Sequence, residues 1–330
     1  MTTRVFYSTD TGAPVLDGTA GSLANVLQTC LVGTAGIAYS GKPACGWTAP
    51  YVGTNKVALR NDTSSGATGQ YFRIDDATGD GRYARFRNYA AMTDVDTGTF
   101  PMPLTSGKFS GGGWLYKSDS ATSATRHWVL VADELTCYFR SQFSTTYNSH
   151  AFIAFGDYDS WVPADPSPVF CMFAQFDSFS ANGPQDYAFN ANSSSNFARS
   201  LDYGVILKDG YSPTDTPVGF YVPKLGVSSG GHGYTNLNTS PGNDPSQGTG
   251  LRTYMPAFVM SEGIVRGQLR GLRVPVNGVS TYLRTQPDFM ELDTGVPGEP
   301  VGSSLLLMLS NPFINANFDC AGAIETALGW

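Results

Sequence analysis

Closely spaced carboxylates are the residues of this chain that come nearest to a catalytic arrangement. A glycoside hydrolase needs two carboxyl groups held about 5 to 10 Å apart across a sugar-binding cleft. The pair Asp75-Asp76 precedes a glycine-rich segment, where aspartate commonly bonds its own backbone, so the sequence favours a turn there. A glycan hydrolase is therefore the least favoured function. The candidates are Asp75, Asp76, Asp94, Asp96, Asp157 and Asp159, with Glu134, Glu262 and Glu291 as possible partners.

Metal-ligating and nucleophilic side chains are scattered along the chain. Residues 94–98 resemble a calcium loop faintly, but they lack the glycine and glutamate spacing of an EF-hand, so a bound cation is the less favoured alternative. No CxxC pair occurs, and His127, His150 and His232 have no neighbouring pattern that marks a triad base, so neither a zinc site nor serine catalysis is indicated. Cys137 and Cys171 lie among bulky apolar residues and are interpreted as small buried hydrophobes. We predict no catalytic, cofactor-binding or metal-binding residue and no enzyme activity.

Aromatic residues in segments without strand pattern are the better candidates for function. In loops, such side chains serve as anchors of protein interfaces or as platforms on which sugars stack. The interface role is favoured over the ligand role. The candidates are Trp47, Tyr51, Tyr147, Trp161 and Tyr234.

The composition indicates the fold class that positions these residues. Charged residues make up only 14% of the chain, and the aromatic 13% falls in short runs separated by turn formers, which is typical of all-β proteins. We predict a mainly antiparallel β-sandwich or barrel-like fold with one or two short helices. The net charge of -7 includes no basic block, which disfavours nucleic acid as a partner. No apolar stretch approaches the roughly 20 residues that span a bilayer, so no membrane partner is predicted.

Local patterns predict one helix and a series of strands. Residues 21–32 have apolar residues at helical spacing, and Ser22 is the expected N-cap. Residues 70–76 and 82–89 alternate between polar and apolar side chains, which predicts a hairpin with one wet and one buried face. Further strands are predicted at 56–60, 114–117, 128–133, 136–140, 151–157, 252–259, 267–275 and 305–309.

Proline-rich and polar segments suggest how the chain is divided. Three prolines at 162–168 interrupt the strand pattern, so we predict an N-terminal β domain at 1–161 and a C-terminal β domain at 162–330, or one large composite domain. The long polar stretches 178–200 and 226–250 are expected to be binding surfaces or segments that become ordered only against a neighbour. A strand-like run begins at Val5, directly after the first residues, so we expect no secretory leader and folding in a cytoplasm.

Several segments, in a fixed order, resemble one family. The N-terminal run FYSTDTGAP (6–14) followed by GTAGSL (18–23) is similar to the start of a family of tailed-bacteriophage virion structural proteins. The later segments GWTAPY (46–51), WVLVAD (128–133) and RGQLRGL (266–272) fit the same template. The resemblance is densest in residues 5–160 and implies a role in the virion, without any catalytic residue to transfer.

These observations together predict a bacteriophage structural protein that assembles with itself and docks to other particle proteins. The resemblance places it in a virion assembled in the cytoplasm of a bacterial host. A tail or neck position is favoured, with an outer capsid decoration next. The alternative is a module that binds a host receptor or surface glycan through the loops between 178 and 250. Homo-oligomers suit a loop-rich, sparsely charged subunit, since its loops would be buried against symmetric neighbours.

Overall fold

The computed structural model describes most of the first half of the chain and separate stretches of the second. In the described part the fold is mainly antiparallel β with a single α-helix, so the predicted all-β class is confirmed. No helix there is long and apolar enough to cross a bilayer. The described residues are 1–77, 79–102, 112–143, 150–165, 167–173, 175–176, 204–207, 216–218, 220–221, 254–261, 264–275, 291–293, 305–309, 322–326 and 330.

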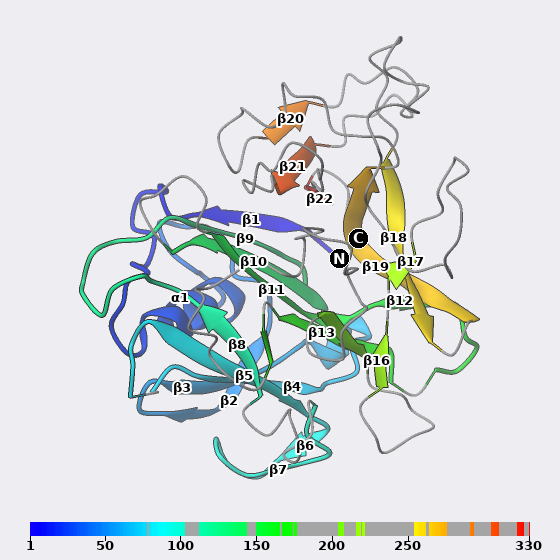
Figure 1. Cartoon of the computed structure of the whole chain (residues 1–330), viewed down its shortest axis with the longest axis horizontal. Helices are drawn as coiled ribbons and strands as arrows, with labels where there is room; N and C mark the ends of the chain where they lie inside the picture. Colours follow the sequence, from blue (N-terminus) through cyan, green and yellow to red (C-terminus); the bar gives the residue numbers. More distant parts are fainter. Residues whose placement is uncertain are drawn as a thin grey trace.

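One antiparallel sheet, called sheet A here, forms the layer that contains β1, β9 and β10, above β3, β4 and β5 in Figure 1. Phe139 and Leu130 of neighbouring strands face each other and are both fully buried. The strand order is β1 (Arg4–Tyr7), β9 (Trp128–Ala132), β10 (Thr136–Gln142), β11 (His150–Asp157), β13 (Val169–Phe173), β15 (Gly204–Leu207) and β16 (Thr216–Val218).

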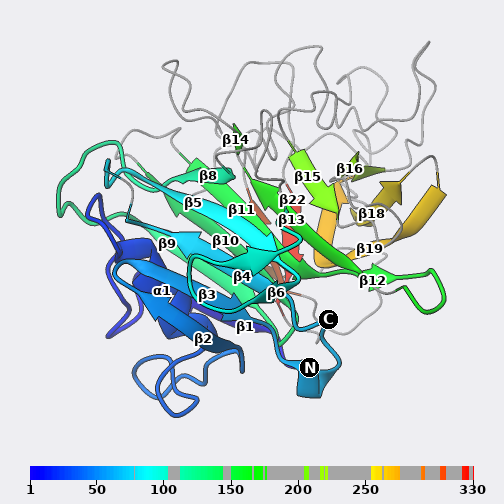
Figure 2. The ribbon, with the colours of Figure 1, turned by 90° about the horizontal axis from the view of Figure 1, so that it is seen from below.

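A second antiparallel sheet, sheet B, lies below sheet A in Figure 1 and in front of it in Figure 2. The predicted hairpin is confirmed, because β4 and β5 pair directly and β4 alternates buried Phe72 and Ile74 with half-buried neighbours. A short hairpin of β6 (Ala91–Met92) and β7 (Gly98–Thr99) follows. The strand order of sheet B is β14 (Gln175–Phe176), β8 (Gly113–Tyr116), β5 (Tyr83–Tyr89), β4 (Tyr71–Asp75), β3 (Lys56–Arg60) and β2 (Thr48–Gly53).

The two sheets pack face to face as a sandwich around one apolar core. Phe72 of sheet B and Phe155 of sheet A are in ring contact at 5.1 Å, and Trp47 contacts both rings. Helix α1 (Ser22–Leu31) lies between the layers at one side and contributes its apolar face to the same core (Figure 1). Among the described strands neither sheet closes on itself, so the sandwich form of the prediction holds rather than the barrel-like form.

The predicted helix is confirmed, but its predicted cap is wrong. The N-cap is Gly21, at φ 89°, and it has no side chain to accept from the first turn. The carboxylate of Asp76, which follows β4, takes over this role by accepting from the amides of Leu23 at 2.8 Å and Ala24 at 3.4 Å. The cap therefore comes from a residue more than fifty positions away.

A third sheet, sheet C, gathers strands from the end of the chain. The strands predicted at 252–259, 267–275 and 305–309 are confirmed as β18, β19 and β21. The predicted boundary at 161 remains a prediction, and β13, β15 and β16 beyond it extend sheet A. The polar stretches 178–200 and 226–250 lie outside the described residues. Sheet C has the order β17 (Phe220–Tyr221), β18 (Tyr254–Ser261), β19 (Ile264–Pro275), β22 (Gly322–Glu325), β21 (Leu305–Leu309) and β20 (Glu291–Asp293), with β12 (Asp159–Ser160) beside β19.

Candidate interaction surface

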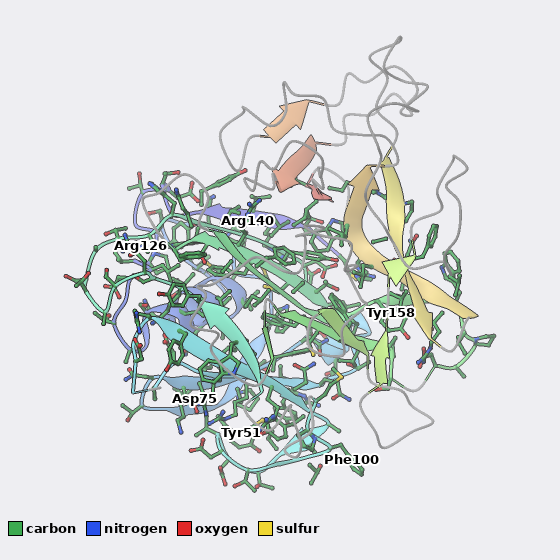
Figure 3. The ribbon with its side chains drawn as sticks, viewed as in Figure 1. Tyr51, Asp75, Phe100, Arg126, Arg140 and Tyr158 are labelled. Atoms are coloured by element: carbon green, nitrogen blue, oxygen red, sulfur yellow. The ribbon has the colours of Figure 1, made fainter. Side chains whose placement is uncertain are left out.

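The outer face of sheet B carries a dense set of arginines and aromatic rings. Three cross-strand rows follow from the register of β2, β3, β4, β5 and β8. Figure 3 shows Tyr51 and Asp75 on this side of the molecule, away from sheet A. We call this surface the arginine–aromatic face; its rows are Arg60-Tyr71-Tyr89, Tyr51-Ala58-Arg73-Arg87 and Lys56-Asp75-Arg85-Trp114, in which Ala58, Tyr89 and Trp114 are themselves buried under their neighbours.

Strand alternation explains why these side chains share one face. Residues two apart on a strand point to the same side, so the buried positions Phe72, Ile74 and Phe86 leave their neighbours facing outward. Aromatic and arginine side chains on adjacent strands then meet as cross-strand pairs. The face is thus a direct product of the period-two pattern in residues 71–89.

Cation–π contacts order the arginines on this face. The Arg85 guanidinium carbon lies 4.2 Å from the centre of the Trp114 ring, and that of Arg60 lies 5.2 Å from the Tyr71 ring. Tyr71 in turn stacks on Tyr51 at 6.0 Å. Contacts of this kind hold a guanidinium flat on a ring without removing its charge. Arg60 and Arg85 form no ion pair with any residue in the described ranges, so their charges are available to a partner.

Two other cations of the face are neutralised from the β6–β7 hairpin. Lys56 donates to Asp96 at 2.9 Å, and Arg73 donates to Asp96 and, at 2.9 Å, to Asp75. Hydrogen bonding from Lys56 is the main reason why the pKa of Asp96 lies below its ordinary value. Asp94 accepts from the Asp96 amide at 2.7 Å, which is a turn contact. These contacts engage the carboxylates on which the calcium-loop alternative depended.

The face is basic although the chain is acidic. It carries the five cations Lys56, Arg60, Arg73, Arg85 and Arg87 against the carboxylates of Asp75 and Asp96, whereas the whole chain has a net charge of -7. Such segregation of charge steers a complementary acidic surface toward the face.

Within the described ranges, the candidate carboxylates Asp157, Asp159 and Glu134 are each bound by other side chains or amides. Asp157 is 3% exposed and accepts from the amide of Thr68 at 2.6 Å and its hydroxyl at 2.7 Å, while Asp159 pairs with Arg270 at 2.6 Å. Burial raises the pKa of Asp157 to about 6. Glu134 binds Arg4, and Glu262 lies outside the described residues. Within the described ranges no three acidic, histidine or cysteine residues are placed to hold a metal ion.

The five aromatic candidates lie in different environments. Trp47 lies in the loop before β2, as predicted, but it is 2% exposed and donates from Nε1 to the Asp133 carbonyl, so it is a core residue and not a surface anchor. Tyr51 lies in β2 rather than in a loop, and it is part of the arginine–aromatic face. Trp161 is 55% exposed, follows β12 and touches Phe258 at 5.5 Å. Tyr147 and Tyr234 lie outside the described residues.

Sequence reasoning missed Arg85, Trp114 and Tyr71 as members of one surface. The alternation in 82–89 did indicate a wet face, which was the available signal. Only loop aromatics were weighed as candidates, and strand aromatics on that wet face were not. Comparison with protein-family models found no match, and a search of curated proteins found no similar sequence.

Proposed function

We propose that this chain is a structural subunit of a tailed-bacteriophage particle, which assembles with itself and docks to other particle proteins. The ordered segments at 6–23, 46–51 and 128–133 support the virion assignment through their resemblance to that family. The same resemblance favours the tail or neck, with an outer capsid decoration as the second position.

The arginine–aromatic face is the observation that carries the docking part of the proposal. Tyr, Trp and Arg are the residues most enriched at the energetic centres of protein interfaces. On this face they are held by ring contacts on a rigid sheet, so little side-chain freedom is lost when a partner binds. A basic sheet face of this kind suits the acidic surface of another subunit.

The first experiment asks whether the chain is in the particle and whether it associates. We expect its peptides in purified particles of the encoding phage by mass spectrometry, and an oligomer or a complex with a particle protein by analytical ultracentrifugation. A strictly monomeric protein whose peptides are missing from intact particles would refute the proposal. If the chain is found in the particle, a density map of the assembled particle would give its position.

The second experiment asks whether the face is the docking surface. Arg85→Glu places a negative charge above Trp114, and we expect incorporation into particles to fall at least tenfold. Arg82→Gln is the matched control, because Arg82 precedes the same strand but pairs with Asp80 at the turn. Equal incorporation of Arg85→Glu and Arg82→Gln would show that docking uses another surface.

Glycan recognition is the second candidate function, and the exposed indole of Trp161 favours it. An aromatic ring open to solvent is a suitable platform for a sugar ring. Host-cell pull-downs and a glycan array with the full chain test this candidate. Binding that disappears in Trp161→Ala would support it, and no binding by the intact chain would exclude it.

A further inference from the structure

Lys117 and Asp76 form a fully buried pair at the edge of the sandwich core. Lys117 follows β8, and Asp76 follows β4, with β5 lying between these strands. The lysine Nζ lies 2.6 Å from Asp76 Oδ1, and both side chains are 0% exposed. No other ion pair in the described ranges is withdrawn from water to this extent on both sides.

A buried ion pair at this place is energetically unfavourable in its charged form. Removing an ammonium and a carboxylate from water costs free energy that their attraction only partly returns. Burial accordingly raises the pKa of Asp76 and lowers the pKa of Lys117, although each charge partly offsets the shift of the other. Both shifts favour transfer of the proton from the ammonium to the carboxylate, which gives a neutral amine beside a carboxylic acid.

The surroundings of Asp76 polarise its carboxyl group. Its second oxygen, Oδ2, accepts from the amides of Leu23 at 2.8 Å and Ala24 at 3.4 Å at the N-terminus of α1. Two backbone donors on one oxygen, aided by the helix dipole, stabilise negative charge that develops there when a nucleophile attacks the carboxyl carbon. Oδ1, which faces Nζ, forms no hydrogen bond of good geometry within the described part of the chain.

The surroundings of Lys117 hold its nitrogen in place for such an attack. Nζ donates to the Ser22 hydroxyl at 2.9 Å and to the Thr19 carbonyl. These acceptors fix the amine beside the carboxyl group, and the fixed geometry replaces a bimolecular encounter by a local one. The Ser22 hydroxyl itself donates to the Asp17 carbonyl at 2.9 Å, which fixes its position, and Nζ lies close enough to Oδ1 to pass a proton to it directly.

From this geometry we propose that Lys117 and Asp76 condense to an intramolecular isopeptide bond. A bond forms between Nζ and the Asp76 carboxyl carbon, and the bond from that carbon to Oδ1 breaks. The ammonium gives up two protons, which leave with Oδ1 as one molecule of water, so the ion pair contains every atom of the product and no oxidant or activating group is needed. The product amide carries no charge, and its remaining oxygen keeps the two amide donors of α1.

The cross-link would join the ends of β4 and β8 and fix both to the start of α1. It would close a covalent loop between residues 76 and 117, which contains β5 and the β6–β7 hairpin. A covalent closure of this kind restricts the unfolded chain in the same way as a disulfide does, but it resists reduction.

Intact-mass measurement of the denatured full chain tests the proposal. We expect the measured mass to be one water molecule lower than the mass calculated from the sequence. The calculated mass includes Met1 if this residue is retained and omits it if it has been removed. After trypsin digestion we expect a branched peptide that joins residues 74–82 to residues 109–126, uncut at Lys117. A full sequence mass, with separate linear peptides cut after Lys117, would overturn the proposal and leave a buried ion pair.

Two variants separate the cross-link from other losses of water. Lys117→Arg keeps a cation but removes the amine, so we expect its full sequence mass. Asp76→Asn should form the same amide with loss of ammonia in place of water. The Asp-Gly sequences at 17–18, 80–81 and 209–210 can lose water by forming a succinimide, which mild base hydrolyses. A loss of water that maps to one of these Asp-Gly sequences, or that is still seen in Lys117→Arg, would also overturn the proposal.

The pair of Lys42 and Asp10 provides a control within the same chain. Its atoms are also 2.6 Å apart, but its side chains are 38% and 24% exposed, so water stabilises both charges. We expect no peptide that links these two residues. A cross-link at both sites would show that the reaction follows from contact alone and not from the buried site.

Discussion

The indole of Trp330 lies directly against the α-carbon of Gly271. A Cβ atom at this position would overlap the ring, and the residue also adopts φ +66°. The indole donates from Nε1 to the Glu325 carbonyl at 2.7 Å and meets the edge of the Tyr138 ring at 5.3 Å. Arg270 of β19 binds both the Trp330 carbonyl and the Met1 sulfur, so the two chain ends marked in Figure 1 meet beside this strand.

We expect Gly271→Ala to destabilise the protein by about 1 to 3 kcal/mol, since it adds backbone strain and displaces the indole. Urea denaturation measures the loss. Trp330→Ala is the control, because it removes the clash and leaves only the strain at residue 271. The two substitutions should therefore be less harmful together than their separate effects predict. Simple additivity would show that the indole does not occupy this place.

The two tryptophans at 47 and 161 should differ sharply in their effect on stability. Trp47→Phe leaves a gap in the core and removes the donor to Asp133, so we expect a loss of about 1 to 3 kcal/mol. Trp161→Phe keeps an aromatic ring at a 55% exposed position, so we expect a change within about 0.5 kcal/mol. Chemical denaturation of the two variants side by side gives the comparison. Equal losses would contradict the assigned burial.

Asp157 should make the protein less stable as the pH rises from about 4 to 6. Burial raises its folded pKa to about 6, whereas the unfolded carboxyl titrates near 3.8. Between these values the folded state holds a proton that the unfolded state has lost, so raising the pH favours unfolding, by about 3 kcal/mol across the window. Asp157→Asn removes this dependence and can still accept from the Thr68 amide. The free energy of unfolding of Asp157→Asn, relative to that of the unchanged protein, should increase up to about pH 6 and then stay constant.

Asp10 provides a control of opposite sign for that measurement. Although burial alone would raise its pKa, hydrogen bonds from Lys42, Tyr7 and Tyr39 lower it below 3.8. Its contribution to stability is therefore present at neutral pH and is lost only when the pH falls below about 4. Asp10→Asn should be destabilising at pH 7 and increasingly neutral in acid. If the stability of Asp157→Asn and that of Asp10→Asn changed with pH in the same direction, relative to the unchanged protein, the cause would be a general charge effect.

Short-range patterns predict the helix and the longer strands of this fold, although not β2 or the short strands. The helical spacing of Leu23, Val26 and Leu27 and the alternation in 71–89 each depend on neighbours in sequence, and both predictions are confirmed. The same patterns place Phe72 and Phe86 inward. Local periodicity therefore indicates which face of a strand is buried in the core. The opposite face of the strand is the one left to contact a partner.

Long-range contacts explain the predictions that failed. Asp76 was interpreted as a turn residue because its neighbours are turn formers, yet its carboxylate caps α1 and meets Lys117. Nothing near residue 22 indicates that the cap comes from residue 76. Trp47 does lie in a loop, but its burial depends on Phe72 and Phe155, which come from two different sheets. Such sites require the sheet pairing, which single-sequence patterns do not contain.

The four described cysteines should be unreactive thiols in the folded protein. Cys30, Cys45, Cys137 and Cys171 are all fully buried, which agrees with the interpretation of Cys137 and Cys171 as small buried hydrophobes. Burial raises the pKa of the thiols of Cys30, Cys45 and Cys137, and only the thiolate reacts readily.

Cys320 lies outside the described residues, so Cys320→Ser gives the background for the test. In that background a thiol reagent should modify no cysteine until the protein is unfolded, and a reducing agent should leave the melting temperature unchanged. Rapid labelling of the native protein would contradict the burial, and a lower melting temperature under reduction would reveal a disulfide.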